Sequence, residues 1–279
     1  MRSEVSGGAM FRFRLAFAGV VSSVLLAAFL YARAETPARG AASPSDVGQR
    51  TPVLVELFTS EGCSDCPPAD ALLQRLDKSQ PVAGADLVVL SEHVDYWDDI
   101  GWKDPYSSHD YTERQGAYAG LFRLRSPYTP QMVIDGRLEL VGSDERVAID
   151  AIRNAAKAEK VPMSLSAVHF EGNNIIALHV EAAALPADLS GRPANVMLAV
   201  ADDSDESQVS HGENAGRTLT HVAVVRSLVV VGTVDKSSSL SKDARIRFTG
   251  GNPRNIRLVA FAQDRTGRIW AVGQARLSN

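Results

Sequence analysis

The only two cysteines of this 279-residue chain, Cys63 and Cys66, lie three positions apart in the stretch VELFTSEGCSDCPPADALLQRL, residues 55 to 76. Such a pair is compatible with three kinds of chemistry: a structural disulfide, a pair of metal ligands or a redox couple. A disulfide that closes so short a loop stabilises a fold by only about 2 kcal/mol, against nearly 5 kcal/mol for a loop of about 100 residues. The short spacing therefore disfavours a purely structural role.

A zinc site would need two further ligands besides the cysteine pair. The six histidines form no second C-x-x-C or H-x3-H motif; they are His93, His109, His169, His179, His211 and His221. Two thiolates suit copper(I), so a copper chaperone that uses the two cysteines, with or without His93, stays an alternative. His211, Glu213, Asn214 and His221 are also potential metal ligands, but a Gly-rich turn that leads into a strand accounts for them equally well.

The elements around the cysteines favour the redox couple. Residues 52 to 59 form an apolar run of strand length, and residues 67 to 78 have helical spacing with Pro67 in the first turn. Cys63 is therefore expected just before a helix N-terminus, where backbone amides and the helix dipole stabilise a thiolate. Cys66 is expected one turn into the helix, where it can attack a mixed disulfide formed at Cys63.

Strands and helices alternate from residue 51 to about residue 160, which predicts an α/β unit. The expected elements after the first helix are a buried strand at 87–90, a hairpin of strands 131–134 and 138–141 around an Asp-Gly turn, and a helix from a Ser143 cap to about Lys160.

Four motifs resemble known proteins: VELFTSEGCSDCPPAD, HVDYWD, YTPQMVIDG and HGENAGRTLTHVAVVR, at residues 55–70, 93–98, 128–136 and 211–226. A C-x-x-C at the start of a helix, followed by a Thr-Pro before a strand and a Gly hairpin, resembles the thioredoxin superfamily. More closely, the motifs resemble a family of secreted thioredoxin-like proteins of unassigned function. The resemblance implies that Cys63 is the attacking thiol, that Cys66 is the resolving thiol, and that Thr129 and a cis Pro130 lie against the pair.

The resemblance also implies a role for Glu56 as the buried acid that assists proton transfer to the resolving thiol. Glu56 lies seven residues before Cys63, one more than is usual, and a surface carboxylate on a strand edge is the alternative. An insertion at about residues 91–126 follows the 87–90 strand. Its first side chains, at the carboxyl edge of the sheet, are expected to line a substrate groove or else to fill a small aromatic core: His93, Asp95, Tyr96 and Trp97.

Beyond residue 162 the sequence consists of alternating or β-branched runs separated by Gly, Asn, Asp and Pro. This pattern predicts a smaller, mainly antiparallel β domain of sandwich type over residues 162–279. The predicted fold is thus a thioredoxin-like α/β domain over residues 51–161, followed by the β domain, with a boundary at Val161-Pro162.

Residues 1–34 have the layout of a secretory signal peptide: two arginines, an uncharged run and the small residues of Ala32-Arg33-Ala34. We expect cleavage after about Ala34, a flexible leader over residues 35–50, and export to a periplasmic or extracellular compartment that permits disulfides. An uncleaved N-terminal anchor is the alternative and the only expected link to a membrane. The formal net charge of −4 and the lack of a basic run disfavour a nucleic-acid partner.

The sequence therefore predicts an exported thiol-disulfide oxidoreductase without a bound cofactor. Its expected partners are a protein or small-molecule disulfide or dithiol and a redox partner protein. The alternatives are the copper chaperone and a non-catalytic binding module with a permanent disulfide. Glu61 and Asp65 are acidic neighbours of Cys63, which predicts a thiol pKa close to that of a free thiol and a disulfide that is comparatively hard to reduce.

Overall fold

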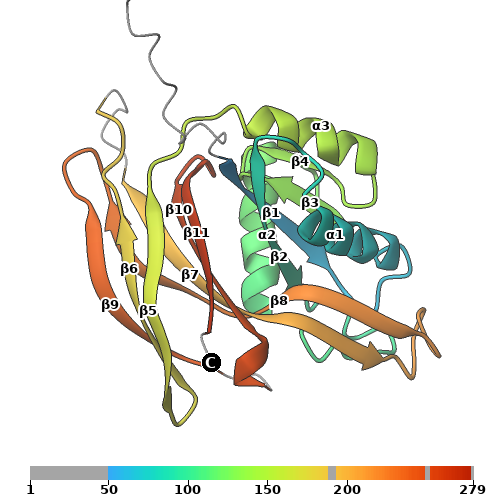
Figure 1. The fold of residues 1–279 in the computed structure, drawn as a ribbon. Coiled ribbons are helices and arrows are strands. Elements are labelled where there is room, and N and C mark those ends of the chain that lie inside the picture. The colour runs from blue at the N-terminus through green and yellow to red at the C-terminus, as the bar shows by residue number, and fades with distance from the viewer. Residues whose placement is uncertain (1–49, 188–192, 249–251, 278–279) are drawn as a thin grey trace, which may run out of the picture. The chain divides into compact units, whose positions relative to one another are not determined.

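A mixed eight-stranded sheet organises the computed structural model, which describes residues 50–187, 193–248 and 252–277. The strand order is β11-β10-β7-β8-β2-β1-β3-β4 (Figure 1). β1 (Thr51–Thr59) and β2 (Ala85–His93) are parallel neighbours, and the antiparallel hairpin of β3 (Gln131–Ile134) and β4 (Leu138–Val141) extends the sheet beyond β1. The predicted signal peptide and nearly all of the predicted leader lie outside the described residues.

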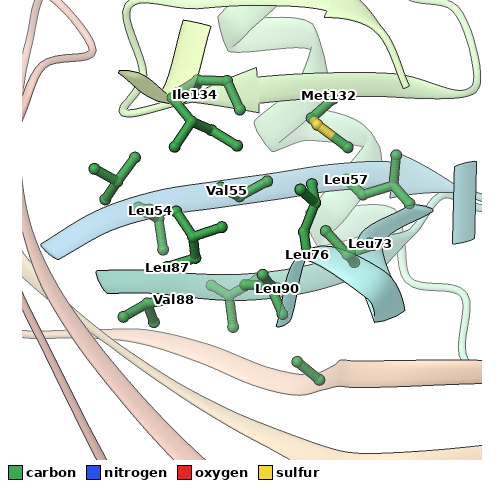
Figure 2. Close-up of a cluster of buried hydrophobic side chains, with 14 of the residues drawn as sticks. Leu54, Val55, Leu57, Leu73, Leu76, Leu87, Val88, Leu90, Met132 and Ile134 are labelled. Carbon is green, nitrogen blue, oxygen red and sulfur yellow. The ribbon is translucent and has the colours of Figure 1, made fainter. Parts of the chain in front are cut away.

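Strands β1 and β2 are buried because helices cover both faces of this part of the sheet. β1 and β2 are therefore almost continuously apolar, as is usual for parallel strands covered on both sides. Figure 2 shows Leu73 and Leu76 of α1 (Pro67–Ser79) next to Leu57 of β1 and Leu90 of β2. Each fully buried leucine contributes about 1.5–3 kcal/mol, so this packing fixes the start of α1 against the end of β1.

α1 begins and ends as its sequence predicts. Pro67 and Pro68 occupy its first turn, where no backbone N–H is needed, and Gln80 ends it in the left-handed conformation. The helix has the predicted extent to within one residue, and the strands predicted at residues 52–59, 131–134 and 138–141 are also present.

The prediction for α3 (Glu145–Ala155) was wrong at both ends. Asp144 rather than Ser143 caps the helix, because its carboxylate accepts a hydrogen bond of 3.0 Å from the Val147 N–H. The helix ends before Lys160, whose ammonium group lies 2.7 Å from the buried carboxylate of Asp135 in the β3–β4 turn.

α2 (His109–Phe122) lies within the predicted insertion and was not predicted as a helix. Its apolar face is short and is interrupted by Gln115, and the helix contains Gly116 and Gly120. Ser108 caps it by accepting a hydrogen bond from the Asp110 N–H at 3.3 Å. α2 covers the face of the sheet opposite α1 and α3 (Figure 1). No helix among the described residues is long and apolar enough to cross a membrane.

Strands account for most of the segment beyond residue 162, as predicted. Four of them complete the large sheet: β7 (Ala194–Gln208), β8 (Thr218–Val234), β10 (Ile256–Asp264) and β11 (Ile269–Arg276). The others form a second, three-stranded sheet: β5 (Met163–Gly172), β6 (Ile175–Ala182) and β9 (Leu240–Arg247). Buried side chains of both sheets form one apolar core between them, which is the arrangement of a sandwich.

The large sheet contains strands from both sides of the predicted boundary at Val161-Pro162. β8 lies beside β2 and pairs with it through Ser91 and Val224. The described residues on both sides of this boundary belong to a single compact unit. The independence of the two predicted domains stays a prediction.

Candidate functional site

Cys63 and Cys66 form a disulfide with a Cα–Cα distance of 5.4 Å at the junction of β1 and α1. Cys66 was expected one turn into the helix but occupies its N-cap position, so its carbonyl accepts from the N–H groups of Ala69 and Asp70 at 2.8 and 3.1 Å. Cys63 lies three residues before this cap. Only 1% of Cys63 and none of Cys66 is exposed, although Ser64 and Asp65 between them are exposed.

The loop between β7 and β8, residues 209–217, covers the disulfide, and we call it the cap loop. Its Asn214 is fully buried and donates from Nδ2 to the carbonyl oxygens of Glu61 and Cys63 at 2.8 and 2.9 Å. Glu213 accepts a hydrogen bond from the Ser64 N–H at 3.2 Å. These contacts explain two of the polar residues in the Gly-rich turn without a metal ion.

A buried polar cluster lies next to the disulfide and is centred on Glu61 and His221. The Glu61 carboxylate accepts from Trp102 Nε1 at 2.8 Å and from the Ser207 hydroxyl. His221 Nε2 lies 3.2 Å from the same carboxylate, and His221 Nδ1 lies 3.9 Å from Asp70 Oδ1. Glu61 stands two residues before Cys63, and Asp70 stands one helical turn after Cys66.

His93 joins this cluster through Asp104. The two fully buried side chains are 2.7 Å apart, from Nδ1 to Oδ2, and Asp104 also accepts from the Glu61 N–H at 2.8 Å. Burial raises the pKa of Asp104, but the adjacent His93 and the hydrogen bonds outweigh burial and lower the pKa. The rings of His93 and His221 meet edge to face, with centroids 4.7 Å apart. His93 therefore lies in the interior behind the disulfide rather than on an open groove.

The charge of His221 depends on its two carboxylate neighbours. Burial lowers its pKa, but Asp70 and Glu61 outweigh burial and raise the pKa of His221 to about 10. This raised pKa favours the imidazolium form of the buried ring at neutral pH. Among the described residues, His221 Nδ1, Asp70 Oδ1 and His93 Nε2 are buried polar atoms without a hydrogen-bond partner, so the cluster keeps unused donor and acceptor capacity.

Glu56 lies in a different cluster, against α2. It is fully buried, so the surface-carboxylate interpretation was wrong. Its carboxylate binds Arg114 at 2.8 Å and Tyr118 at 2.6 Å. Side chains alternate between the faces of a strand, and Leu57 is the residue that packs on the α1 side. The extra residue between Glu56 and Cys63 thus turns Glu56 away from the cysteines, which contradicts its predicted role as their acid.

Three other predicted residues connect to the cysteine turn. The Thr129-Pro130 peptide bond is cis, as predicted. Trp97 Nε1 donates to Thr129 Oγ1 at 2.8 Å. Gly62, next to Cys63, packs closely against Trp97, since a Cβ there would lie 3.1 Å from Trp97 Cβ. Trp97 and Thr129 therefore form a packed wall beside the turn.

Asp95 and Tyr96 point toward α2 instead of the cysteine turn. Asp95 accepts from the Thr112 hydroxyl at 2.5 Å, and the Tyr96 hydroxyl donates to Gln115 at 3.1 Å. The four residues that were predicted to line one groove therefore lie in two different places. Trp97 and His93 lie near the cysteine turn, whereas Asp95 and Tyr96 fasten α2 to the sheet.

Residues 54–263 match the model of a protein family described as "Protein of unknown function (DUF1223)". The chain belongs to this family. All residues of the cysteine turn, the cap loop and the polar cluster lie within the matched range. Among curated proteins there is no significant match.

Two solved structures resemble this member of the DUF1223 family over most of its length. A protein from Agrobacterium tumefaciens is 26% identical with a TM-score of 0.59, and the match covers 81% of this chain and 94% of that one. HBP35 of Porphyromonas gingivalis is 16% identical with a TM-score of 0.57, and the match covers 82% and 76%. At 16% identity the second likeness concerns the fold alone.

The sequence analysis missed three features of this DUF1223 site. Two are the residues Asp70 and Asp104, and the third is the charge of His221. Asp70 carried a readable signal, because it follows Cys66 by one helical turn and faces the same side of α1. Asp104 and His221 carried none, since tertiary contacts across 43 and 160 residues bring them to Glu61. Among the described residues, no group of three or more His, Cys, Asp or Glu side chains is arranged to hold a metal ion.

Proposed function

We propose that this protein is an exported thiol-disulfide oxidoreductase of thioredoxin-like fold that works through Cys63 and Cys66. The observation that carries the proposal is the position of the disulfide at the start of α1, directly beside the buried cluster of Glu61, Asp70 and His221. A disulfide that only stabilises the fold needs no buried charges next to it. In thiol-disulfide exchange the reactive species is a thiolate, and the charges around the cysteines set how much of it is present.

Two further observations support the thioredoxin-like part of the proposal. The cis bond before Pro130 occurs where the resemblance implies it, at the start of β3. β1, α1 and the β3–β4 hairpin follow one another in the expected order. The export part rests on the N-terminal sequence alone, which lies outside the described residues.

The proposed reaction consists of two exchanges. The Cys63 thiolate attacks a substrate disulfide, so a Cys63–substrate disulfide forms, the substrate bond breaks and one substrate thiolate leaves. The Cys66 thiol then loses its proton and attacks Cys63, which forms the Cys63–Cys66 disulfide and releases the second substrate thiolate. The protein is oxidised and the substrate reduced, and the reverse sequence oxidises a dithiol. A redox partner protein would restore the starting state.

Substrate access requires movement, because neither sulfur-bearing residue is exposed beneath the cap loop. This burial favours one rival function, a binding module with a permanent disulfide. The copper-chaperone alternative has no comparable support, because the described His93 is engaged with Asp104 inside the protein.

The test is a disulfide-exchange assay with insulin as the substrate. We expect activity in the wild-type protein, no activity in Cys63→Ser, and stable mixed disulfides in Cys66→Ser. Ser64→Ala is the matched control, since Ser64 is exposed between the cysteines and contributes no sulfur. A wild-type protein that is inactive against insulin and against reduced, unfolded proteins would refute the proposal and leave the binding module.

A further inference from the structure

We propose that His221 is the positioning residue that stabilises the thiolate of the redox pair, and that the C-terminal segment supplies it to the site for this purpose. The inference rests on the proposed thiol-disulfide chemistry and extends it, since the sequence motifs of the cysteine turn contain no cation. His221 comes from β8, more than 150 residues after the cysteines along the chain.

The position of His221 supports this role. Its ring lies between Glu61 and Asp70, with contacts of 3.2 Å to Glu61 Oε1 and 3.9 Å to Asp70 Oδ1. Glu61 precedes the cysteine turn, and Asp70 follows it by one turn of α1. The ring therefore lies next to the carboxylates that flank the cysteine turn along the chain, and only 1% of its side chain is exposed. Water does not screen the charge of this ring as it would at the surface.

The other groups that face His221 come from five segments. Glu61 and Asp70 are the two carboxylates of the cysteine turn and α1. His93 meets the ring from β2, and the Tyr106 ring meets it from the loop before α2, with centroids 5.7 Å apart. Asp205 of β7 lies opposite His221 in the strand register. His221 is thus the cation in a group that is otherwise rich in acidic side chains.

A buried cation here would offset the acidic neighbours of the cysteines. When the disulfide is reduced, two thiols appear beside Glu61 and Asp70, and these carboxylates disfavour a thiolate. The His221 imidazolium favours it. His221 keeps its proton throughout the exchange, and the two thiol protons pass to the two substrate thiolates. The role is therefore electrostatic, and His221 does not act as the proton carrier.

Two substitutions give opposite expectations. His221→Gln removes the cation while keeping a hydrogen-bonding side chain of similar length, so the thiol pKa of the reduced protein should rise and the thiolate fraction at neutral pH should fall about tenfold. Glu61→Gln removes a carboxylate and keeps the shape, so the thiolate fraction should rise. A change of fold alone would not move the two variants in opposite directions.

The experiment is a pH titration of the chemically reduced protein, followed by the ultraviolet absorbance of the thiolate. The Cys63→Ser/Cys66→Ser double variant supplies the blank, and His179→Gln is the matched control because His179 lies on β6 with Asp243 as its partner. Exchange activity with insulin is measured in parallel. We expect a raised thiol pKa and slower exchange in His221→Gln, a lowered pKa in Glu61→Gln and no shift in the control.

The two readouts separate the two proposals. If the wild-type protein is active but neither variant moves the thiol pKa, the role of His221 is refuted and the proposed function stands. If the wild-type protein has no exchange activity but the two variants move the pKa in opposite directions, the electrostatic role of His221 stands and the proposed function is refuted. If His221→Gln does not fold, His221→Asn takes its place, and an unchanged or lowered thiol pKa in that variant overturns the inference.

Discussion

At the scale of single residues, two clusters of buried charges lie on opposite sides of the sheet and have different roles. On one face, Glu61 and His221 lie next to the cysteines. On the other, Arg114 of α2 binds Glu56 at 2.8 Å and lies 3.5 Å from Glu92. Burial raises the pKa of Glu92 well above its usual value, although Arg114 opposes this effect. The cluster around Arg114 connects α2 to the sheet.

Arg114→Met should strongly destabilise the protein because it leaves Glu56 and Glu92 buried without their cation. We expect a loss of about 3–5 kcal/mol in the free energy of unfolding, measured with urea, and little change in exchange activity once the variant is folded. The control is Arg75→Met, whose partner Glu145 is exposed, with an expected loss of at most about 1 kcal/mol. If Arg114→Met kept full stability but lost exchange activity, the prediction would be wrong and the Arg114 cluster would contribute to the reaction.

The buried charge of His221 predicts a pH dependence of stability. Its pKa is about 10 in the folded protein and about 6.5 in an unfolded chain, so the folded protein holds a proton that the unfolded chain has lost between these values. This contribution is complete below about pH 6.5 and disappears as the pH rises toward 10. We expect the free energy of unfolding to fall by up to about 1.4 kcal/mol per pH unit in this window.

The check is urea unfolding at a series of pH values for the wild-type protein and for His221→Gln. The variant should lack this component of the slope, whereas His179→Gln should retain it. Equal slopes in wild type and His221→Gln would mean that the ring carries no proton in the folded protein.

At the scale of elements, the cap loop controls access to the disulfide. Asn214 donates two hydrogen bonds to the cysteine turn, and each such bond is worth about 1 kcal/mol. Asn214→Ala should loosen the loop and increase the rate of reduction by dithiothreitol about tenfold. Ser210→Ala lies in the same loop and loses only a contact with His211, so its rate should match the wild type. An unchanged rate in Asn214→Ala would show that the cap loop does not limit access.

Local pattern predicted those elements that local forces determine. β1, α1 and the β3–β4 hairpin could be predicted because apolar periodicity, prolines in a first turn and an Asp-Gly turn all act within a few residues. Residues 109–122 were not predicted as α2, because the apolar face of this helix is short and tertiary contacts such as the Arg114–Glu56 ion pair add to its stability. The contact of the cap loop with the cysteine turn could not be predicted either, since Asn214 and Cys63 are 151 residues apart.

The choice between adjacent positions also limited the site prediction. Glu56 had the right chemistry for a buried acid, but a shift of one residue along a strand reverses the face of the sheet. Ser143 and Asp144 are both good N-caps, and only the observed bond to Val147 decides between them. A prediction that changes when the position shifts by one residue therefore needs the three-dimensional contacts.

At the scale of the whole molecule, the eight-stranded sheet joins both halves of the sequence. Buried residues on both sides of position 161 form one apolar core, such as Leu87 and Leu90 with Ala223 and Phe261. We therefore expect the two halves to unfold in one cooperative transition, with fluorescence and circular dichroism changing together. Two separate transitions would support the two independent domains that the sequence predicted.

The account depends most on the claim that the Cys63–Cys66 disulfide is redox-active. The reduction potential of this disulfide, measured by equilibration with glutathione or dithiothreitol, tests that claim most directly. With His221 offsetting the acidic neighbours of Cys63, we predict a potential between about −300 and −200 mV, a range that includes thioredoxin and the glutaredoxins. A potential below about −300 mV, the region of structural disulfides, would contradict the account.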